Sequence, residues 1–185
     1  DPDNPGTAIR FTGGEHLEIR DDAAFNVGRE VTMMGWVNVE LRELDTTPLF
    51  YRGGDAGQSF ALSLSSFGEI VLETVSTGGT LTRLETTSNI IPLNEWLHIA
   101  GTVDRTTGVM TIYLNGVEVA SRSVSLDDMR INNGPLMIGA SSEDDPLFGR
   151  FVGLLDDLSV WSRALTADEV AAAASGQDIA NTAGL

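Results

Sequence analysis

The chain of 185 residues is long enough for one domain with a hydrophobic core, and 42% hydrophobic with 21% charged residues is typical of a globular protein. It has no cysteine, which excludes disulfides, thiolate metal sites and cysteine nucleophiles, and no apolar run approaches the roughly 18–20 residues that span a bilayer. The net charge of −16 comes from 27 acidic residues against 11 basic residues, all arginines. Such a surface repels nucleic acid, and it serves either solubility or cation binding.

Hydrophobic and polar residues alternate with period two along most of the chain, and turn residues interrupt the alternation at intervals of about 8–12 residues. This spacing predicts an all-β fold, an antiparallel sandwich of short strands, rather than a parallel sheet with helical crossovers. Asn115-Gly116 predicts the tip of a hairpin, because both residues tolerate positive φ. The main expected strands are 7–12, 16–20, 31–40, 59–65, 69–75, 80–87, 95–104, 109–116, 135–139 and 150–161.

One short C-terminal helix is expected after the last strand. Thr166 and Glu169 have the spacing of a capping box, and Leu165 and Val170 that of a hydrophobic staple. Gly176 supplies a stop, so we expect the helix to lie on the edge of the sandwich. The domain organisation is then an N-terminal extension (1–6), the sandwich domain (7–176) and a C-terminal tail (177–185).

The sequence offers no positive sign of catalysis. His98 lies on a strand face with apolar neighbours, where a lone histidine is more often a hydrogen-bonded core residue than an acid–base catalyst. His16 is placed at the surface or beside a ligand site. Glu43 and Asp45 in "ELDTTP" match part of the E-x-D-x-x-E strand motif of sandwich-fold glucanases, but Pro48 stands where the second glutamate is needed. A glycosidase or lyase is therefore the least favoured hypothesis.

Calcium binding is the more plausible chemistry, since Ca²⁺ takes six to eight oxygen ligands from irregular loops. Glu143, Asp144 and Asp145 lie in the acidic loop "SSEDD", and Asp55 in "RGGDAGQ" is expected beside it. A nearby cation would relieve the repulsion among these carboxylates. The alternative is a solvated acidic loop.

Two adjacent aspartates interrupt the closing strand, "GRFVGLLDDLSVW". Simple alternation places Asp156 on the face of Leu154 and Leu158, among apolar neighbours, where an ionised carboxylate must be paired or hydrogen-bonded. It places Asp157 on the opposite face with Leu155, where it needs no special role. Asp156 is therefore expected to have such a partner.

These segments resemble, in chain order, the laminin-G-like, concanavalin-A-like jelly rolls of secreted bacterial proteins, with pentraxins as more distant relatives. The resemblance covers about residues 7–175 and implies a two-sheet antiparallel jelly-roll sandwich with ligand loops at one rim. The resemblance depends on the order of the segments rather than on any single one of them. The segments include "AIRFTGGEHLEI", "VTMMGWVNV", "LNEWLHIAGTVD", "PLMIGA" and "GRFVGLLDDLSVWSRALTADEV".

The resemblance also implies metal ligands. In many relatives a calcium ion ties the first strand to the last. Asp156 occupies the position of their closing-strand aspartate, so the resemblance implies that it tethers the last strand to the first. Glu15 and His16 occupy positions where Asp or Asn is common. The acidic loop, together with Asp55, resembles a second calcium site of pentraxins, although Ala56 follows Asp55 here in place of Asn. The metal ligands implied at the two sites are Asp156, Glu15, Asp55, Glu143, Asp144 and Asp145.

The sequence thus favours a non-catalytic binding module of a secreted or cell-surface bacterial protein. It would be a monomer or part of a multidomain chain, and calcium would be its cofactor. It would recognise a glycan or an extracellular protein through rim residues, with no nucleic-acid binding and no membrane insertion. The expected ligand-binding residues are Asp55, Gln58, Glu143, Asp144 and Asp145.

The second hypothesis is a structural or adhesive module in which calcium serves stability alone. Sugar sites usually expose aromatic rings, and the three tryptophans (36, 96 and 161) fall on strand positions of the family. Only Phe148 and Tyr51 are aromatic candidates near loops, which argues against a sugar site.

Overall fold

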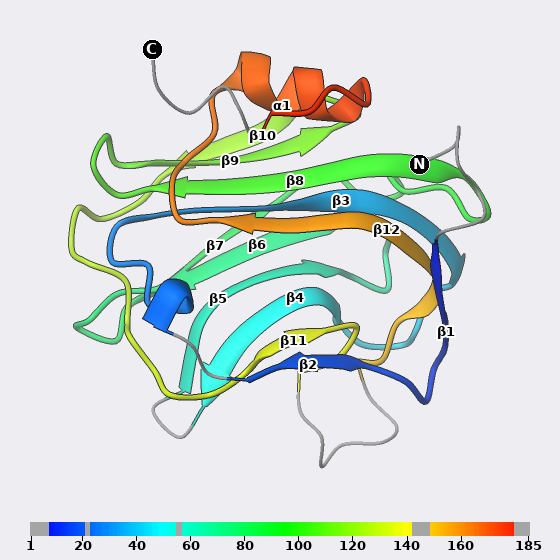
Figure 1. Cartoon of the computed structure of the whole chain (residues 1–185), viewed down its shortest axis with the longest axis horizontal. Coiled ribbons are helices and arrows are strands. Elements are labelled where there is room, and N and C mark those ends of the chain that lie inside the picture. The colour runs from blue at the N-terminus through cyan, green and yellow to red at the C-terminus, as the bar shows by residue number, and fades with distance from the viewer. Residues whose placement is uncertain (1–7, 21–22, 55–56, 142–148, 180–185) are drawn as a thin grey trace.

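The computed structural model describes residues 8–20, 23–54, 57–141 and 149–179, which form two antiparallel sheets of six strands each. We name them sheet A (order β1-β12-β3-β8-β9-β10) and sheet B (order β2-β11-β4-β5-β6-β7), and they face one another (Figure 1). The predicted jelly-roll sandwich with one short C-terminal helix is confirmed. The strands are β1 (Ile9–Thr12), β2 (Leu17–Ile19), β3 (Glu30–Leu41), β4 (Thr47–Gly54), β5 (Gly57–Leu64), β6 (Ile70–Val75), β7 (Leu81–Glu85), β8 (Trp96–Asp104), β9 (Val109–Leu114), β10 (Val117–Ser123), β11 (Leu136–Ile138) and β12 (Val152–Trp161).

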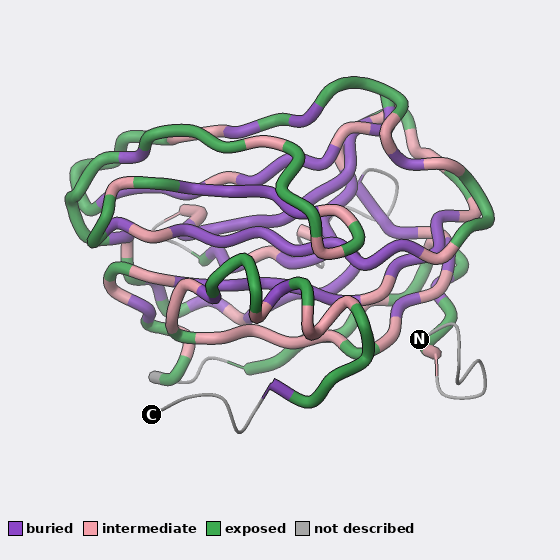
Figure 2. Tube along the Cα trace, turned by 90° about the horizontal axis from the view of Figure 1, so that it is seen from above, coloured by how far each residue is buried: buried purple, intermediate pink, exposed green. Residues whose placement is uncertain are grey.

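The main core lies between the sheets and follows the alternation of each strand. On β3, Val31, Met33, Val37 and Val39 are buried against the inward residues of sheet B, as the period-two pattern predicts. Buried residues run along the strands, whereas exposed residues gather in the turns and on β10 (Figure 2). Burial of the apolar inner faces is therefore what holds the two sheets together.

The helix α1 (Ala167–Ala174) has the predicted capping box, with the Thr166 hydroxyl accepting from the Glu169 N–H. The predicted staple is also present, because Leu165 and Val170 are both buried. They belong to a second apolar cluster with Met34 of β3 and other residues on the outer face of sheet A. The helix therefore covers that face rather than the edge of the sandwich. No helix in the described ranges is long and apolar enough to cross a membrane.

A long connection between β10 and β11 crosses one end of the sandwich and is held by a buried arginine. Arg105 is fully buried, and its Nη1 donates to the carbonyls of Ser125 (3.1 Å) and Asp127 (3.0 Å). Its Nη2 donates to Thr74 Oγ1 of sheet B at 3.2 Å. Met129 of the same connection is buried in the main core. Hydrogen bonds to a charged donor thus replace the water that these carbonyls lose.

The single alternation expected for the closing strand is wrong. A β-bulge between Asp156 and Ser159 inserts one residue opposite β3, and Asp157 takes a left-handed conformation with φ +48°. The inward face therefore changes phase: Leu155 points into the core before the bulge, and Leu158 and Val160 pack against it afterwards. Asp156 pairs with Trp36 on the outer face of sheet A, so it does not share a face with Leu158.

The bulge also explains a glycine in the middle of β3. A Cβ at Gly35 would lie 2.6 Å from Leu158 Cδ2, so the missing side chain makes room for the leucine that the bulge turns inward. The bulge and Gly35 are thus one packing unit.

His98 is buried, as predicted, with its ring edge-on to Trp36 at 5.5 Å between ring centroids. Its buried Nδ1 has no hydrogen-bond partner in the described part of the chain. Desolvation by burial lowers the pKa of His98 to about 4. The ring is therefore neutral at pH 7.

Replacement of Gly153 should be costly, because a Cβ there would lie 2.1 Å from the Asn38 carbonyl oxygen of β3. We expect Gly153→Ala to lower the free energy of unfolding by about 2–4 kcal/mol, measured by urea denaturation. Gly14→Ala is the matched control, since a Cβ at Gly14 meets nothing within 4 Å. Equal midpoints for the two variants would contradict this packing.

His98 should make the fold sensitive to mild acid. In the unfolded chain its pKa returns to about 6.5, so between pH 6.5 and about 4 the unfolded state binds a proton that the native state does not. Its contribution is complete above pH 6.5 and falls as pH drops toward 4. At about 1.4 kcal/mol per pH unit, the wild type should lose about 2 kcal/mol more than His98→Gln between pH 7 and pH 5. Parallel stability-against-pH curves for the two proteins would refute the assignment.

Candidate ligand-binding face

Five polar side chains gather on the outer face of sheet B, and we call them the polar row. Cross-strand pairing places Tyr51 beside Ala61, Ala61 beside Glu73 and Glu73 beside Arg83. Their sequence neighbours Phe50, Phe60, Leu72 and Leu84 are buried in the core, so the alternation turns the row outward. The polar row comprises Tyr51, Gln58, Glu73, Arg83 and Glu85.

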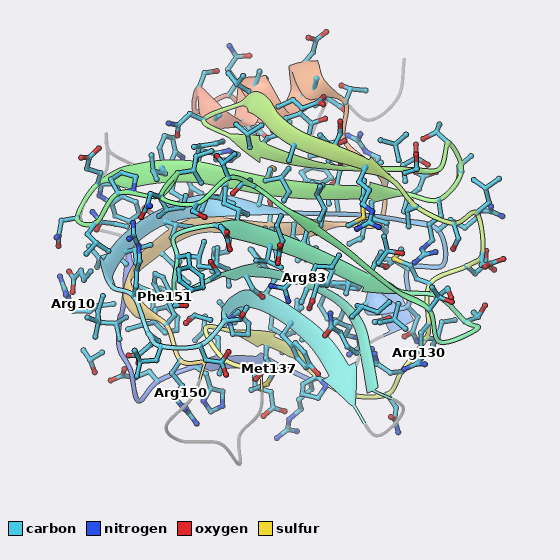
Figure 3. The ribbon with its side chains drawn as sticks, turned by 180° about the vertical axis from the view of Figure 1, so that it is seen from behind. Arg10, Arg83, Arg130, Met137, Arg150 and Phe151 are labelled. Atoms are coloured by element: carbon cyan, nitrogen blue, oxygen red, sulfur yellow. The ribbon has the colours of Figure 1, made fainter. Side chains whose placement is uncertain are left out.

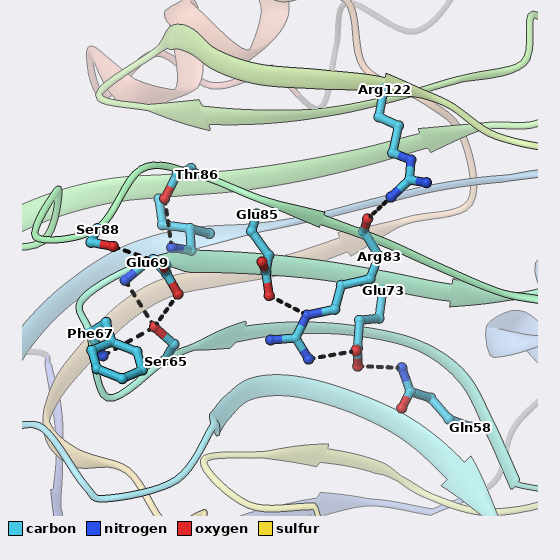
Figure 4. Close-up of polar contacts among 11 residues, drawn as sticks. Gln58, Ser65, Phe67, Glu69, Glu73, Arg83, Glu85, Thr86, Ser88 and Arg122 are labelled. Atoms are coloured by element: carbon cyan, nitrogen blue, oxygen red, sulfur yellow. Dashed lines mark hydrogen bonds and ion pairs between the residues drawn. The ribbon is translucent and has the colours of Figure 1, made fainter.

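Glu73 lies at the centre of a hydrogen-bond network (Figure 4). Its Oε1 is 3.2 Å from Arg83 Nη1, and its Oε2 accepts from Gln58 Nε2 at 3.1 Å. Arg83 Nε also donates to Glu85 on the same strand. The Glu73 side chain is only 16% exposed, whereas that of Arg83 is 40% exposed. The network therefore fixes the carboxylate while leaving part of the guanidinium accessible.

Tyr51 adds an aromatic ring to this face. The ring lies over Gly53 of its own strand, where any Cβ would come within 2.4 Å of Tyr51 Cε1. Burial, and then the negative charge of Glu73, raise the pKa of Tyr51, so its hydroxyl stays protonated at neutral pH and can donate. Ala61 lies between Tyr51 and Glu73 in the cross-strand pairing and is buried.

This inventory suits a ligand rich in hydroxyl groups. The row offers a carboxylate that accepts hydrogen bonds, a guanidinium that donates them, an amide that does both, and an aromatic ring with an apolar face. Such a combination orients a sugar by a few placed polar groups and stacks one side of its ring. Figure 3 shows this sheet from behind, with Arg83 of β7 and Met137 of β11 labelled on two of its strands.

The β4–β5 turn connects the polar row to the residues predicted from the sequence. Gln58 follows the turn directly, and Gly54 and Gly57 pair across it. The turn residue Asp55 lies outside the described residues, as do Glu143, Asp144 and Asp145 of the acidic loop. Gln58 is thus the predicted ligand residue that the structure places in the row.

The structure does not bring Glu15 and Asp156 together. The β1–β12 ladder runs from Thr12 opposite Val152 to Ile9 opposite Leu155. Glu15 lies past the first end and Asp156 past the second, and at about 3.3 Å per residue the ladder alone separates them by about 10 Å. One ion with ligands 2.3–2.6 Å away does not reach both.

Each of these two carboxylates has local partners. Glu15 accepts from the Thr12 N–H at 2.7 Å and from its hydroxyl at 2.9 Å, and the backbone hydrogen bond, with that of the hydroxyl, lowers the pKa of Glu15. Asp156 Oδ1 accepts from the Asp157 N–H at 3.0 Å. Across the described ranges, no group of three or more histidines and carboxylates could hold a metal. The predicted calcium ligands outside these ranges stay a prediction.

Sequence reasoning missed Glu73 and Arg83. They are outward positions of two recognisable strands, "IVLETV" and "LTRLE", so the alternation alone marks them as surface residues. Only the pairing register makes them neighbours, and register depends on turn geometry that composition does not give.

Comparison with family models matches residues 11–171 to the concanavalin A-like lectin/glucanases superfamily, through its laminin-G model. A search of curated protein sequences returns no match. Many solved structures share the fold.

The binding domain of Paraclostridial Mosquitocidal Protein 1 has a TM-score of 0.71 and 22% identity over 91% of this chain, which spans 43% of that one. The native heptameric SAP-like pentraxin from Limulus polyphemus has a TM-score of 0.71 and 20% identity, covering 93% of this chain and 83% of its own. Domain 4 of AbnA, a GH43 extracellular arabinanase from Geobacillus stearothermophilus solved with arabinotriose, has a TM-score of 0.68 and 24% identity. That match covers 90% of this chain and 76% of the other.

At these identities the structural likeness establishes the fold alone. The family match covers most of the chain, in the order of strands that the structure describes. The chain belongs to the concanavalin A-like lectin/glucanases superfamily.

Proposed function

We propose that this chain is a non-catalytic carbohydrate-binding module of an extracellular or cell-surface protein, and that the polar row is part of its binding face. The observation that carries the proposal is the fixed Glu73 carboxylate with an amide, a guanidinium and an aromatic ring around it. Hydrogen bonds to charged groups are among the stronger ones, and a rigid acceptor loses little entropy when a hydroxyl binds. The arabinanase domain described with arabinotriose supports a sugar ligand for this fold.

The polar row is better arranged for binding than for glycoside hydrolysis. Hydrolysis uses one carboxyl group that gives a proton and a second that attacks or activates water. Here Glu73 and Glu85 both pair with the same guanidinium, that of Arg83. Both carboxylates are thus already engaged by one arginine side chain.

A protein receptor is the second candidate partner. The mosquitocidal protein's domain is described as a binding domain, and the same face would present charged and aromatic groups to a protein surface. A glycan is preferred because one fixed carboxylate with a few polar neighbours and one aromatic ring makes a small site, whereas a protein interface needs a broad surface of about 800 Å² on each partner.

Loss of the central carboxylate should weaken glycan binding. We expect a glycan array to identify a ligand, and Glu73→Gln to weaken its binding about tenfold, equivalent to about 1.4 kcal/mol, because the amide keeps the shape but loses the charge. Isothermal titration gives the dissociation constant. Glu118→Gln on exposed β10 is the control and should bind as the wild type does. The proposal fails if no polysaccharide binds with or without calcium, or if Glu73→Gln binds like the control.

Calcium is proposed to stabilise the module through Asp55 and the Glu143–Asp145 loop. An ion that binds only the native state at about 100 times its dissociation constant adds about 2.7 kcal/mol. We therefore expect a chelator to lower the melting temperature by several degrees, calcium to restore it, and Asp144→Asn with Asp145→Asn to abolish the response. Glu95→Gln with Glu118→Gln matches the charge change at exposed positions. Identical melting in chelator and in calcium would disprove a structural ion.

A further inference from the structure

Arg83 of β7 is held through two of its three guanidinium nitrogens (Figure 4). Its Nε donates to Glu85, and its Nη1 donates to Glu73 at 3.2 Å. Its Nη2 has no acceptor among the described residues, and the side chain is 40% exposed. Two bonds to carboxylates fix the plane of a guanidinium, so both N–H groups of Nη2 have a fixed direction in the polar row.

Acceptor positions lie beside this donor. Glu73 Oε1 accepts from Nη1, the other terminal nitrogen of the same guanidinium, so it lies within a few ångströms of Nη2. A carboxylate has about four acceptor positions, and the hydrogen bonds from Gln58 and Arg83 fill two of those of Glu73. The polar row therefore presents a fixed donor next to a fixed acceptor.

Two hydroxyl groups on adjacent carbon atoms match this pair of groups. One hydroxyl oxygen accepts from Arg83 Nη2, and the other hydroxyl donates its proton to the Glu73 carboxylate. A ligand group that only accepts, such as a carboxylate, completes the first interaction and leaves the Glu73 oxygens facing a like charge. The arrangement is thus selective for a neutral pair of hydroxyls.

The charges around the row also oppose an acidic ligand. The Arg83 guanidinium lies between two carboxylates, so a third carboxylate meets two repulsions for one attraction. Arg122 and Arg130 lie outside the row, since Arg122 donates from β10 to the backbone carbonyl of Arg83 and Arg130 lies against the β4–β5 turn. At Tyr51 the charge of Glu73 acts as that of an anion, because it raises the pKa of the phenol, after burial.

We propose that the polar row binds neutral glycans through two adjacent hydroxyl groups, one on Arg83 Nη2 and one on Glu73, and that Glu85 positions the donor. The inference rests on the glycan binding proposed above and narrows its ligand class. The ligands are neutral polymers whose repeating unit keeps two adjacent free hydroxyls, as in cellulose, xylan and pectic galactan. Polymers of uronic acids are poor ligands, because every unit carries a carboxylate.

A polysaccharide array tests the ligand class in buffer without calcium, so that no ion bridges a ligand carboxylate. We expect the bound polymers to be neutral ones with the hydroxyl pair, at least about tenfold tighter than laminarin, whose backbone units keep no such pair, and than polygalacturonate. Equally tight binding of laminarin or of polygalacturonate would overturn the inference and leave glycan binding itself standing. Absence of binding to every glycan would instead remove the proposed function.

Arg83→Lys separates the directed donor from the positive charge, because lysine keeps the charge and loses the planar fork. Isothermal titration with the tightest polymer of the array should show binding about tenfold weaker than that of the wild type. Arg10→Lys is the matched control, since Arg10 forms an exposed ion pair with Glu40 on sheet A, and it should bind as the wild type does. Wild-type affinity in Arg83→Lys would refute the role of Nη2.

Two variants of Glu85 test its positioning role. Glutamine keeps an oxygen that accepts from Arg83 Nε, so Glu85→Gln should bind the same polymer as the wild type does. Glu85→Ala releases Nε, so it should bind about threefold more weakly, as a less ordered donor does. Because the Glu85 side chain is 43% exposed, both variants should keep the melting temperature of the wild type. Equal affinities of the two variants would show that Glu85 does not position the donor.

Discussion

The closing strand β12 is the constraint on which the other features depend. It lies between β1 and β3, so the last strand of the chain joins the first strand to the centre of sheet A. Its bulge reverses which side chains face inward, and the missing side chain at Gly35 leaves room for Leu158. If the same residues continued in an unbroken alternation, Leu158 and Val160 would point to the outer face and Asp157 would point into the core, at the cost of burying a charge. The two adjacent aspartates thus mark a change of phase rather than a pair of ligands.

A buried charged side chain, Arg105, also supports the polar row by binding backbone carbonyls of the β10–β11 connection. Arg105 holds the connection that leads from β10 to Arg130, and the Ser59 hydroxyl of β5 donates to the Arg130 carbonyl. A Cβ at Gly57 would lie 2.8 Å from Arg130 Nη1, so this side chain lies against the β4–β5 turn. The buried arginine therefore positions, through the connection, the turn that carries Gln58. Arginine suits this role because its guanidinium donates in several directions and stays charged when buried.

The sequence predicts the elements well and the site only in part. Alternation, the Asn115-Gly116 hairpin and the Thr166–Glu169 capping box depend on neighbours in the chain, and each is confirmed. The bulge was not predicted, because Asp157 with positive φ leaves the composition of the strand unchanged.

The candidate site shows the same limit, since it depends on contacts between distant segments. The polar row needs the register of four strands, and the separation of Glu15 from Asp156 needs the direction of the β1–β12 ladder. Neither can be predicted from the order of the family segments or from local alternation, because both depend on residues far apart in the chain. Gln58, predicted as a ligand residue, lies beside the β4–β5 turn that the family resemblance singled out, and its role stays a prediction.

The geometry of Glu73 also sets how strongly the proposed face can bind. Its two oxygens already accept from Gln58 and Arg83, and a carboxylate has about four acceptor positions, so a ligand hydroxyl can add without displacing either partner. The existing bonds hold the carboxylate in place and remove much of the entropic cost of binding. An open sheet face, however, buries little of a ligand's surface, and one fixed acceptor contributes only about 1–3 kcal/mol. Tight binding therefore requires a second wall beside the polar row.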